Sequence, residues 1–374
     1  MSDSEINKEY EAIVVDTSIF DSNGLRLETG LLGQIKQFRE SPIEYLLPDV
    51  IKNEIQSHLE KKIKVARSAL EKSINEAGYH LFFDGSALNN AKQLLIDSHE
   101  IKSLAYSRLT NFIKNTGALV IDCGEFVSVQ KVLESYFSNT APFSETGKKK
   151  NEFPDAIVLL AIEEWAERED KKVLAIAQDN DWKAYCKTSN RIDYLESFSE
   201  GLASFQTATA PFVLVGNLKV ALDNEVASSF LQKLETQLSF ALDGLTPDQE
   251  ADSHLYWEPE GSNGWFKNFE LINHEFRVID SDDEWVVFEI SAKITIEAEG
   301  EFSLSVYDSI DRDHVGMGSV SALAEADFES EILITLSGDL SGDINDLEID
   351  EVEVVDQISS VDFGTIDLDY GEGE

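Results

Sequence analysis

The stretch Ala12-Ile13-Val14-Val15-Asp16-Thr17-Ser18 decides the fold of the first half of the chain. Its apolar residues predict a buried strand over residues 11–16, and an acid closes that strand. A second apolar run, Val173-Leu174-Ala175-Ile176-Ala177, predicts another buried strand, which is followed by Asp179 and Asp181. Because helical patterns lie between them, the two strands are predicted to belong to a parallel sheet with helices on its faces.

The spacing of apolar residues assigns most of the chain between those strands to helices. We predict a helical insertion in an α/β core. It consists of a long helix from about Asp49 to Gly78 and a second helix over residues 87–115, which is ended by Gly117. The remaining expectations are helices over 31–40, 126–137 and 154–168, a strand over 118–121, a polar loop over 138–152 and a helix from about 181.

Acidic side chains stand at the ends of several of these elements. Asp16 follows the first buried strand, and Asp179 and Asp181 follow the second. Asp155 opens an apolar helix, and Glu54 lies early in the long helix. An open α/β sheet gathers side chains at such positions into one crevice. Several carboxylates in one crevice repel each other unless a divalent cation joins them, so the pattern predicts a metal site.

These motifs resemble those of PIN-domain nucleases. The four matching stretches, in order, are Val14-Val15-Asp16-Thr17-Ser18, Glu54, Phe153-Pro154-Asp155-Ala156-Ile157 and Ala175-Ile176-Ala177-Gln178-Asp179-Asn180-Asp181-Trp182. The chain differs from the family in its long helical insertion and at Ala177, where Ser or Thr is usual. The resemblance covers roughly residues 10–200. It implies a PIN-like nuclease domain over residues 10–205 that hydrolyses phosphodiesters with Mg²⁺ or Mn²⁺ and usually acts on RNA.

The chemistry of hydrolysis is consistent with these acids. Cleaving a phosphodiester needs an activated water and a counter-charge on the transition state, and carboxylate-held Mg²⁺ supplies both. Mg²⁺ binds oxygen ligands and keeps several waters, so three or four acids suffice. The expected direct ligands are Asp16, Asp155 and Asp179. Glu54 and Asp181 are expected to hold a second ion or to orient waters.

Contacts to nucleic acid need local positive charge, which the sequence offers in two places. Lys148-Lys149-Lys150 directly precedes Asp155, so this loop is predicted to bind substrate. Ser18 is placed to hydrogen-bond a ligand carboxylate or a metal-bound water. The second basic cluster, for which a solvated helix face is the plainer interpretation, consists of Lys61, Lys62, Lys64 and Arg67.

Other interpretations of the same residues stay open. An Asp at a strand end is often a turn residue, and an Asp at a helix start is often an N-cap. A haloacid-dehalogenase-type phosphatase is disfavoured by Ser18, where it needs a second Asp, and a von Willebrand-type adhesion site by Phe20, where it needs Ser. Trp182 is assigned to helix packing rather than to stacking on a base. The alternative to a nuclease is a non-catalytic protein-interaction module with a degenerate acidic site.

Charge divides the chain near residues 205–220. The formal net charge of −42 comes from about 33 acids and 24 bases up to residue 216, and about 39 acids and 6 bases after it. We therefore expect a separate acidic domain over residues 217–374. So much negative charge repels nucleic acid. Three roles are left for this domain: an accessory domain, a surface for a basic protein partner, or an intramolecular mimic that covers the nuclease groove.

The hydropathy pattern of this acidic region changes from helical to alternating. Residues 217–242 predict one amphipathic helix, and alternation from about residue 253 predicts an antiparallel sheet with one apolar and one acidic face, hence an α+β domain. The expected strands are 284–299 and 302–307, paired across Gly300, then 331–336 and 350–355.

The composition also bears on location. No apolar run reaches the length of a membrane span, and the N-terminus has no secretory pattern. The two cysteines, Cys123 and Cys186, are interpreted as buried small residues rather than as a disulfide framework. We therefore expect a cytoplasmic protein with no membrane partner.

Overall fold

The chain divides into two compact units, Met1–Phe205 and Gln206–Glu374. Within them the computed structural model describes residues 10–39, 41–80, 85–97, 100–141, 143, 153–206, 209–282, 284–308, 312–340 and 344–368. None of the helices in these ranges is long and apolar enough to cross a membrane.

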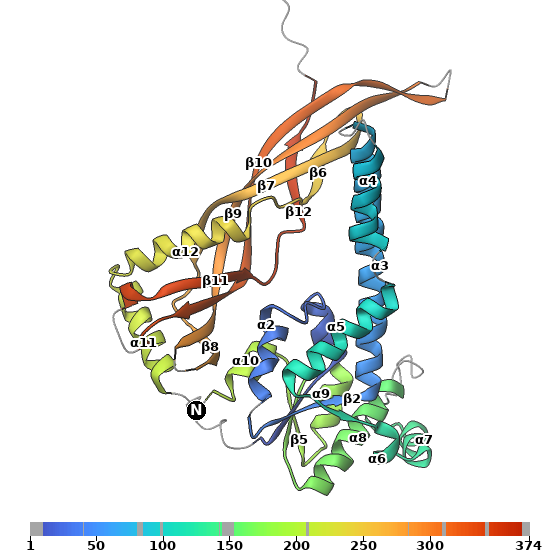
Figure 1. Cartoon of the computed structure of the whole chain (residues 1–374), viewed down its shortest axis with the longest axis vertical. Coiled ribbons are helices and arrows are strands. Elements are labelled where there is room, and N and C mark those ends of the chain that lie inside the picture. The colour runs from blue at the N-terminus through green and yellow to red at the C-terminus, as the bar shows by residue number, and fades with distance from the viewer. Residues whose placement is uncertain are drawn as a thin grey trace, which may run out of the picture. The chain divides into compact units, whose positions relative to one another are not determined.

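The first unit is built on a five-stranded parallel sheet in the order β3-β2-β1-β4-β5 (Figure 1). The strands are β1 (Ala12–Val15), β2 (Glu44–Pro48), β3 (Leu119–Ile121), β4 (Val173–Ile176) and β5 (Ile192–Leu195). The central strand β1 and its neighbour β4 are buried along their whole length. Helices cover both faces of such a sheet, which is why these two strands consist of uninterrupted apolar residues. The predicted α/β class is confirmed.

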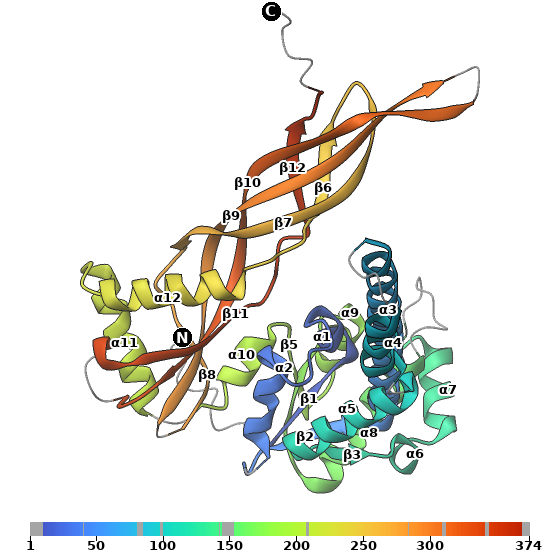
Figure 2. The same ribbon diagram turned by 45° about the horizontal axis from the view of Figure 1, so that its top comes forward.

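Helices of 4 to 17 residues flank the sheet, and the insertion is formed by one much longer helix and the short elements beside it. The flanking elements are α1 (Thr17–Ser22), α2 (Gly30–Gly33), the 3₁₀ helix η2 (Gln34–Phe38), α5 (Ile101–Thr116), α6 (Cys123–Phe126), α7 (Val129–Ser138), α8 (Phe153–Glu169), α9 (Asn180–Cys186) and α10 (Phe198–Ala203). The insertion contains α3 (Asp49–His80), α4 (Gly85–Lys92) and the π-helical turn η3 (Gln93–Asp97). Helix α3 rises from the sheet as a long column with α4 alongside its far half (Figures 1 and 2).

Three details of this unit differ from the sequence prediction. Strands β2 and β5 were not predicted, because each is a short apolar stretch next to Pro or charged residues. Helix α3 does not end at Gly78 but continues to His80. Gly78 serves close packing instead, since a Cβ there would lie 2.7 Å from a methyl group of Leu88 on α4. The helix predicted over 87–115 is broken, and α5 begins afresh after Glu100.

The second unit combines two helices with a long, twisted antiparallel sheet in the order β11-β10-β9-β7, with β8 also paired to β9. A separate pair, β6 and β12, is parallel. The elements are α11 (Thr209–Asp223), α12 (Ser228–Ala241), β6 (Asp248–Asp252), β7 (Tyr256–Leu271), β8 (Arg277–Ser281), β9 (Trp285–Asp308), β10 (Asp313–Ser337), the 3₁₀ turn η4 (Ile344–Asp346), β11 (Glu348–Val354) and β12 (Ser360–Thr365). The predicted richness in antiparallel strands is confirmed.

Two predictions for this unit are wrong in detail. The single helix expected over 217–242 is two helices, separated by a turn in which Glu225 has a left-handed φ of 59°. Gly300 does not turn the chain, because β9 runs straight through it as one strand of 24 residues. Its lack of a side chain allows close approach instead, since a Cβ would lie within 3 Å of Gln249, Phe363 and Phe302.

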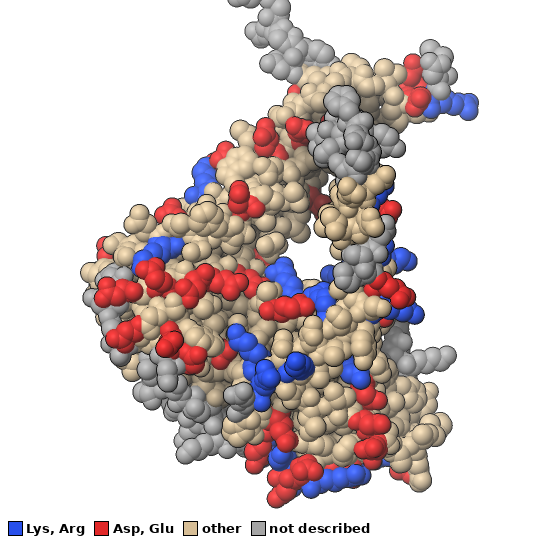
Figure 3. Space-filling model, in the orientation of Figure 1, with Lys and Arg blue, Asp and Glu red and all other residues tan. Residues whose placement is uncertain are grey.

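The main sheet of this unit has one apolar and one polar face. Along β9, Ile294, Ile296 and Ala298 are fully buried against the other strands and the two helices. The alternate residues Glu297, Glu299 and Glu301 point the other way, so the acids are spread along the outer face. Figure 3 shows acidic side chains in separate patches on the face of this unit that it draws.

Candidate metal centre

The carboxyl edge of the parallel sheet is the natural place for a site in the first unit. The chain winds from β1 outward to β2 and β3, and then returns to the other side of β1 for β4 and β5. The strand order therefore reverses between β1 and β4, and ligands of open α/β sheets bind outside the carboxyl ends of the strands at such a point. Val15 and Ile176 are partners in register, so Asp16 and Asp179 both emerge at this edge.

Asp16 is held firmly at the end of β1. Its backbone N–H donates to the carbonyl of Ile176, 2.9 Å away, and its carboxylate caps α1 by accepting the N–H of Ser18. The Ser18 hydroxyl donates to the same carboxylate oxygen at 2.5 Å and accepts the N–H of Gln178 at 3.1 Å. Burial raises the pKa of Asp16, the Ser18 hydrogen bonds oppose that rise, and Asp179 adds to it. Ser18 thus orients Asp16, as a serine beside a ligand carboxylate would.

Asp179 and Asp181 come from the turn between β4 and α9. Asp179 is the N-cap of α9, and its carboxylate accepts the N–H of Asp181 at 2.6 Å. Asp181 lies in the first turn of that helix and is partly exposed. Asp16 and Asp179, for which a turn residue is the plainer expectation, are both N-caps. Capping does not exclude a ligand role, because each carboxylate has a second oxygen.

Glu54 reaches the same edge from α3. That helix starts directly after β2, and Ile51, Ile55 and Leu59 are buried on one side of it. The Glu54 carboxylate accepts a hydrogen bond from the Thr17 hydroxyl at 2.8 Å, which ties α3 to the residue after Asp16. This role of Thr17 is not predicted by the sequence motifs. A hydroxyl directly after a strand-end Asp was the available signal.

Asp155 completes the group from the first turn of α8. The indole N–H of Trp182 donates to its carboxylate at 3.1 Å, and Trp182 is fully buried. The packing assignment of Trp182 is thereby confirmed, but its role in positioning Asp155 was not predicted. Burial raises the pKa of Asp155 to about 7, against the effect of the Trp182 hydrogen bond. The charges of Asp16, Asp179 and Glu54 add to that rise, so these four carboxylates are close enough to repel one another.

The donor set suits a divalent cation in its chemistry. Carboxylate oxygens are the ligands that Mg²⁺ and Mn²⁺ prefer. As the side chains stand, no group of three or more His, Cys, Asp and Glu residues in the described ranges surrounds one point closely enough to hold an ion. Carboxylates that repel each other favour separated rotamers when no cation lies between them. Binding an ion would therefore require side-chain rotation about a backbone that already brings Asp16, Glu54, Asp155 and Asp179 together.

Of the predicted substrate contacts, Ser18 lies at the site, and the lysine loop falls where the structure gives no description. The loop Lys148-Lys149-Lys150 falls outside the described residues, so its role in binding substrate stays a prediction.

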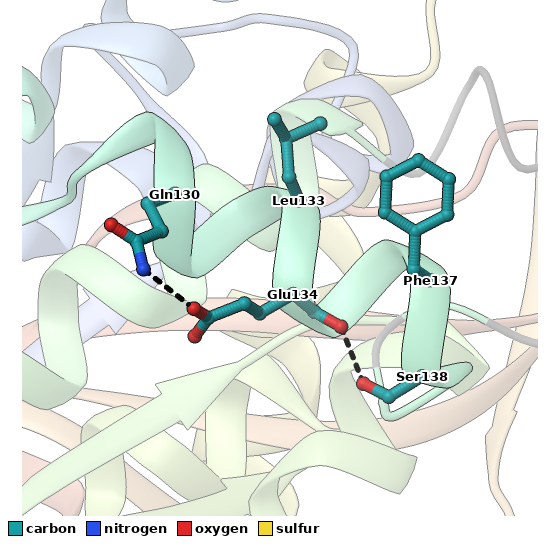
Figure 4. Close-up of a pocket in the computed structure, with 5 residues that line it drawn as sticks. All are labelled: Gln130, Leu133, Glu134, Phe137 and Ser138. Carbon is teal, nitrogen blue, oxygen red and sulfur yellow. Dashed lines mark hydrogen bonds between the residues drawn. The ribbon is translucent and has the colours of Figure 1, made fainter.

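An open apolar groove lies on α7, lined by Gln130, Leu133, Glu134, Phe137 and Ser138 (Figure 4). None of the predicted site acids lines this groove. Cys123 and Cys186 are both buried and unbridged, as predicted.

A cluster of carboxylates at the reversal point of a parallel α/β sheet is typical of a divalent-metal site. Residues 13–182 match the PIN domain family. Members of the family are generally metal-dependent nucleases that act on RNA. The resemblance drawn from the four motifs is thus confirmed, whereas the second unit matches no family. No curated protein and no solved structure matches the chain.

Proposed function

We propose that this protein is a Mg²⁺- or Mn²⁺-dependent endoribonuclease, with Asp16, Asp155 and Asp179 as direct ligands of the ion. The observation that carries the proposal is that Asp155 stands at the carboxyl edge of the PIN-like sheet with Asp16, Asp179 and Glu54 near enough to raise its pKa. A site that holds like charges together stores a repulsion that a divalent cation relieves.

The residues around the acids support this assignment. Ser18 and Trp182 each donate a hydrogen bond to one carboxylate, of Asp16 and of Asp155 respectively, and so fix its orientation. Thr17 does the same for Glu54, which we assign, with Asp181, to orienting water molecules or to a second ion. A bound divalent ion would supply an activated water near neutral pH and positive charge for the transition state.

The second unit has no part in the proposed chemistry. Its 39 acidic and 6 basic residues would repel RNA. A basic protein is the partner that this charge would suit, and an accessory role is the simpler alternative.

Cleavage of labelled RNA by the full chain tests the proposal. Wild-type protein with Mn²⁺ should cut a mixed-sequence RNA internally, EDTA should stop the reaction, and a DNA of the same sequence should be cut more slowly. Asp16→Asn should lower the rate by about 10³-fold or more, in line with the loss of a charged group that acts on the transition state. Asp327→Asn, an acid of the second unit, is the matched control and should retain full activity.

The same assay distinguishes the nuclease from the interaction module. Absence of cleavage by the wild type with either ion, or equal cleavage by wild type and Asp16→Asn, would contradict the proposal. Mn²⁺ binding followed by calorimetry gives an independent measurement, because a degenerate site would take up no ion in either protein.

A further inference from the structure

Helix α3 connects the acidic cluster to a row of exposed lysines. It is one continuous helix of 32 residues, so it extends about 48 Å. Ile51, Ile55 and Leu59, all at most 1% exposed, fix its first turns against the first unit. The lysines that follow are therefore held at set distances from Glu54 by the helix itself, rather than by a loop.

The direction of the row follows from helix geometry. Each residue turns by about 100°, so Lys61, seven positions after Glu54, points within about 20° of it, and Lys72, eighteen positions after it, points the same way. Lys62 and Lys64 flank this line by about 80° on either side. The packed side of the first turns is centred about 100° from Glu54, at Ile51, Ile55 and Leu59. It therefore lies on the side of Lys62 and away from Lys64.

The charge of this stretch is unusual for the chain. Residues 61–70 contain four bases and no acid, in a chain with a net charge of −42. Lys61, Lys62 and Lys64 are exposed and form no ion pair with any residue in the described ranges. Lys72 is 3.8 Å from Glu76, and both side chains are mostly exposed, so this pair restrains the lysine weakly. Arg67 is half-buried and points away from the row.

A polyanionic substrate needs such a surface because the site itself is acidic. The carboxylates around Asp155 repel phosphates, so a long substrate gains affinity only from cations placed away from them. Along the helix axis, Lys61, Lys64 and Lys72 lie about 10, 15 and 27 Å from Glu54. No aromatic side chain faces outward between Lys61 and Lys72, so the row offers charge without stacking on bases.

We propose that α3 is a binding arm for the phosphate backbone of single-stranded RNA, with Lys61, Lys62, Lys64 and Lys72 as its contacts. The proposal rests on the nuclease function and adds where the strand runs beyond the cleaved bond. A straight row on one helix follows an extended strand, whereas each strand of a duplex winds away from a straight helix. Binding by charge alone should be independent of sequence.

The experiment compares two variants that each remove two positive charges from the full chain. The arm variant is Lys61→Gln/Lys64→Gln, and the control is Lys114→Gln/Lys187→Gln. Both control lysines are exposed and lie just before β3 and β5, at the opposite edge of the sheet from the acids. Fluorescence anisotropy with a labelled 20-nucleotide oligo(U), in EDTA, measures affinity without metal or cleavage.

The salt dependence gives the decisive result. Two lost phosphate contacts should lower the slope of log affinity against log salt by about 1.4 and weaken binding by roughly 20-fold at 0.1 M salt. The control should keep the wild-type slope. The proposed role of α3 would be contradicted if the two variants had equal slopes of log affinity against log salt. It would also be contradicted if the wild type did not bind oligo(U) at about 50 mM salt. Tighter binding of a 20-base-pair duplex, with the same loss in the arm variant, would overturn the assignment to single strands.

Cleavage separates this inference from the nuclease proposal. With Mn²⁺, the arm variant should show a raised KM and an unchanged kcat, because its lysines lie away from the reacting bond. Asp16→Asn should bind oligo(U) with the wild-type slope and cut nothing. If the wild type fails to cut RNA, the arm variant can still show the lower salt dependence of binding. That combination would support RNA binding by α3 and contradict the nuclease function.

Discussion

The two units both contain many acids, but their folds place those acids in opposite situations. In the first unit, Asp16 is only 6% exposed, and Asp155 has a pKa raised to about 7 by burial and by neighbouring carboxylates. In the second unit, Asp327 is exposed, and hydrogen bonds from Lys293 and Thr295 lower its pKa. Carboxylates crowded together with no neighbouring Lys or Arg indicate a metal-binding site. A surface carboxylate paired with a lysine, such as Asp327, does not. The arrangement of the acids, rather than their number, is the informative property.

The topology of each sheet explains the contrast. Parallel strands end at a common edge, so residues far apart in sequence, such as Asp16 and Asp179, become neighbours there. Side chains alternate along a strand, and an antiparallel sheet can leave one face open, so Lys293, Glu297, Glu299 and Glu301 of β9 all point onto one open face. On that face Glu297 lies directly opposite Glu325, and Lys267 binds Glu325 to offset the repulsion.

The largest effect is expected when one acid in each unit is replaced by asparagine. Asp155→Asn should reduce RNA cleavage by about 10³-fold or more, as expected for the loss of a metal ligand. Its fold should be kept, because removing one of several crowded charges relieves repulsion in the metal-free protein. Asp327→Asn should leave cleavage unchanged. Cleavage rates and circular dichroism of both variants measure the effects on activity and on the fold. Full activity of Asp155→Asn would show that Asp155 only caps its helix.

A smaller effect is expected from the partner of Asp155. Trp182→Phe preserves a buried aromatic ring but removes the indole N–H that donates to the carboxylate. A lost supporting hydrogen bond of this kind typically costs about 10- to 100-fold in activity or metal affinity. Steady-state kinetics and Mn²⁺ titration measure both quantities. Trp257→Phe, at a tryptophan of the second unit, is the matched control, and equal losses in the two variants would indicate a general packing defect.

Much of this contrast was predictable from sequence, and the misses have physical reasons. The runs around Asp16 and Asp179 identify buried parallel strands because they contain no polar residue. Gly78 and Gly300 were misassigned as helix end and turn, because a glycine needed for close packing has the same one-letter signal as a glycine needed for a turn. Contacts such as Thr17 with Glu54 depend on tertiary positions that no local pattern encodes.

The pH dependence of stability should have opposite signs in the two units. The pKa of Asp155 is raised in the folded, metal-free protein, so the folded state binds this proton more tightly than the unfolded state. The stabilisation from Asp155 is therefore present at low pH and is lost as pH rises from about 4 to about 7. In EDTA, the Tm of Asp155→Asn minus that of wild type should grow over this range.

For Asp327 the sign reverses. Its pKa is lowered, so its contribution is present above about pH 4 and is lost as pH falls, and it is small because the group is exposed. Thermal melts of both Asn variants and the wild type at several pH values supply the measurement. Parallel Tm curves for wild type and Asp155→Asn would mean that the carboxylates do not repel one another in solution.

The smallest expected effect tests whether the acids of the second unit act on RNA at long range. Glu297→Gln/Glu299→Gln/Glu301→Gln removes three charges from the outer face of β9 in the full chain. Affinity for oligo(U) should rise a few-fold at 10 mM salt, where charges act over about 30 Å, and should not change at 150 mM, where they act over about 8 Å. The triple Glu→Asp variant preserves the charge and should bind as the wild type does. A gain that persists at 150 mM salt would replace long-range repulsion by a direct effect of these side chains, and no gain at 10 mM would leave the acidic face without influence on the nuclease.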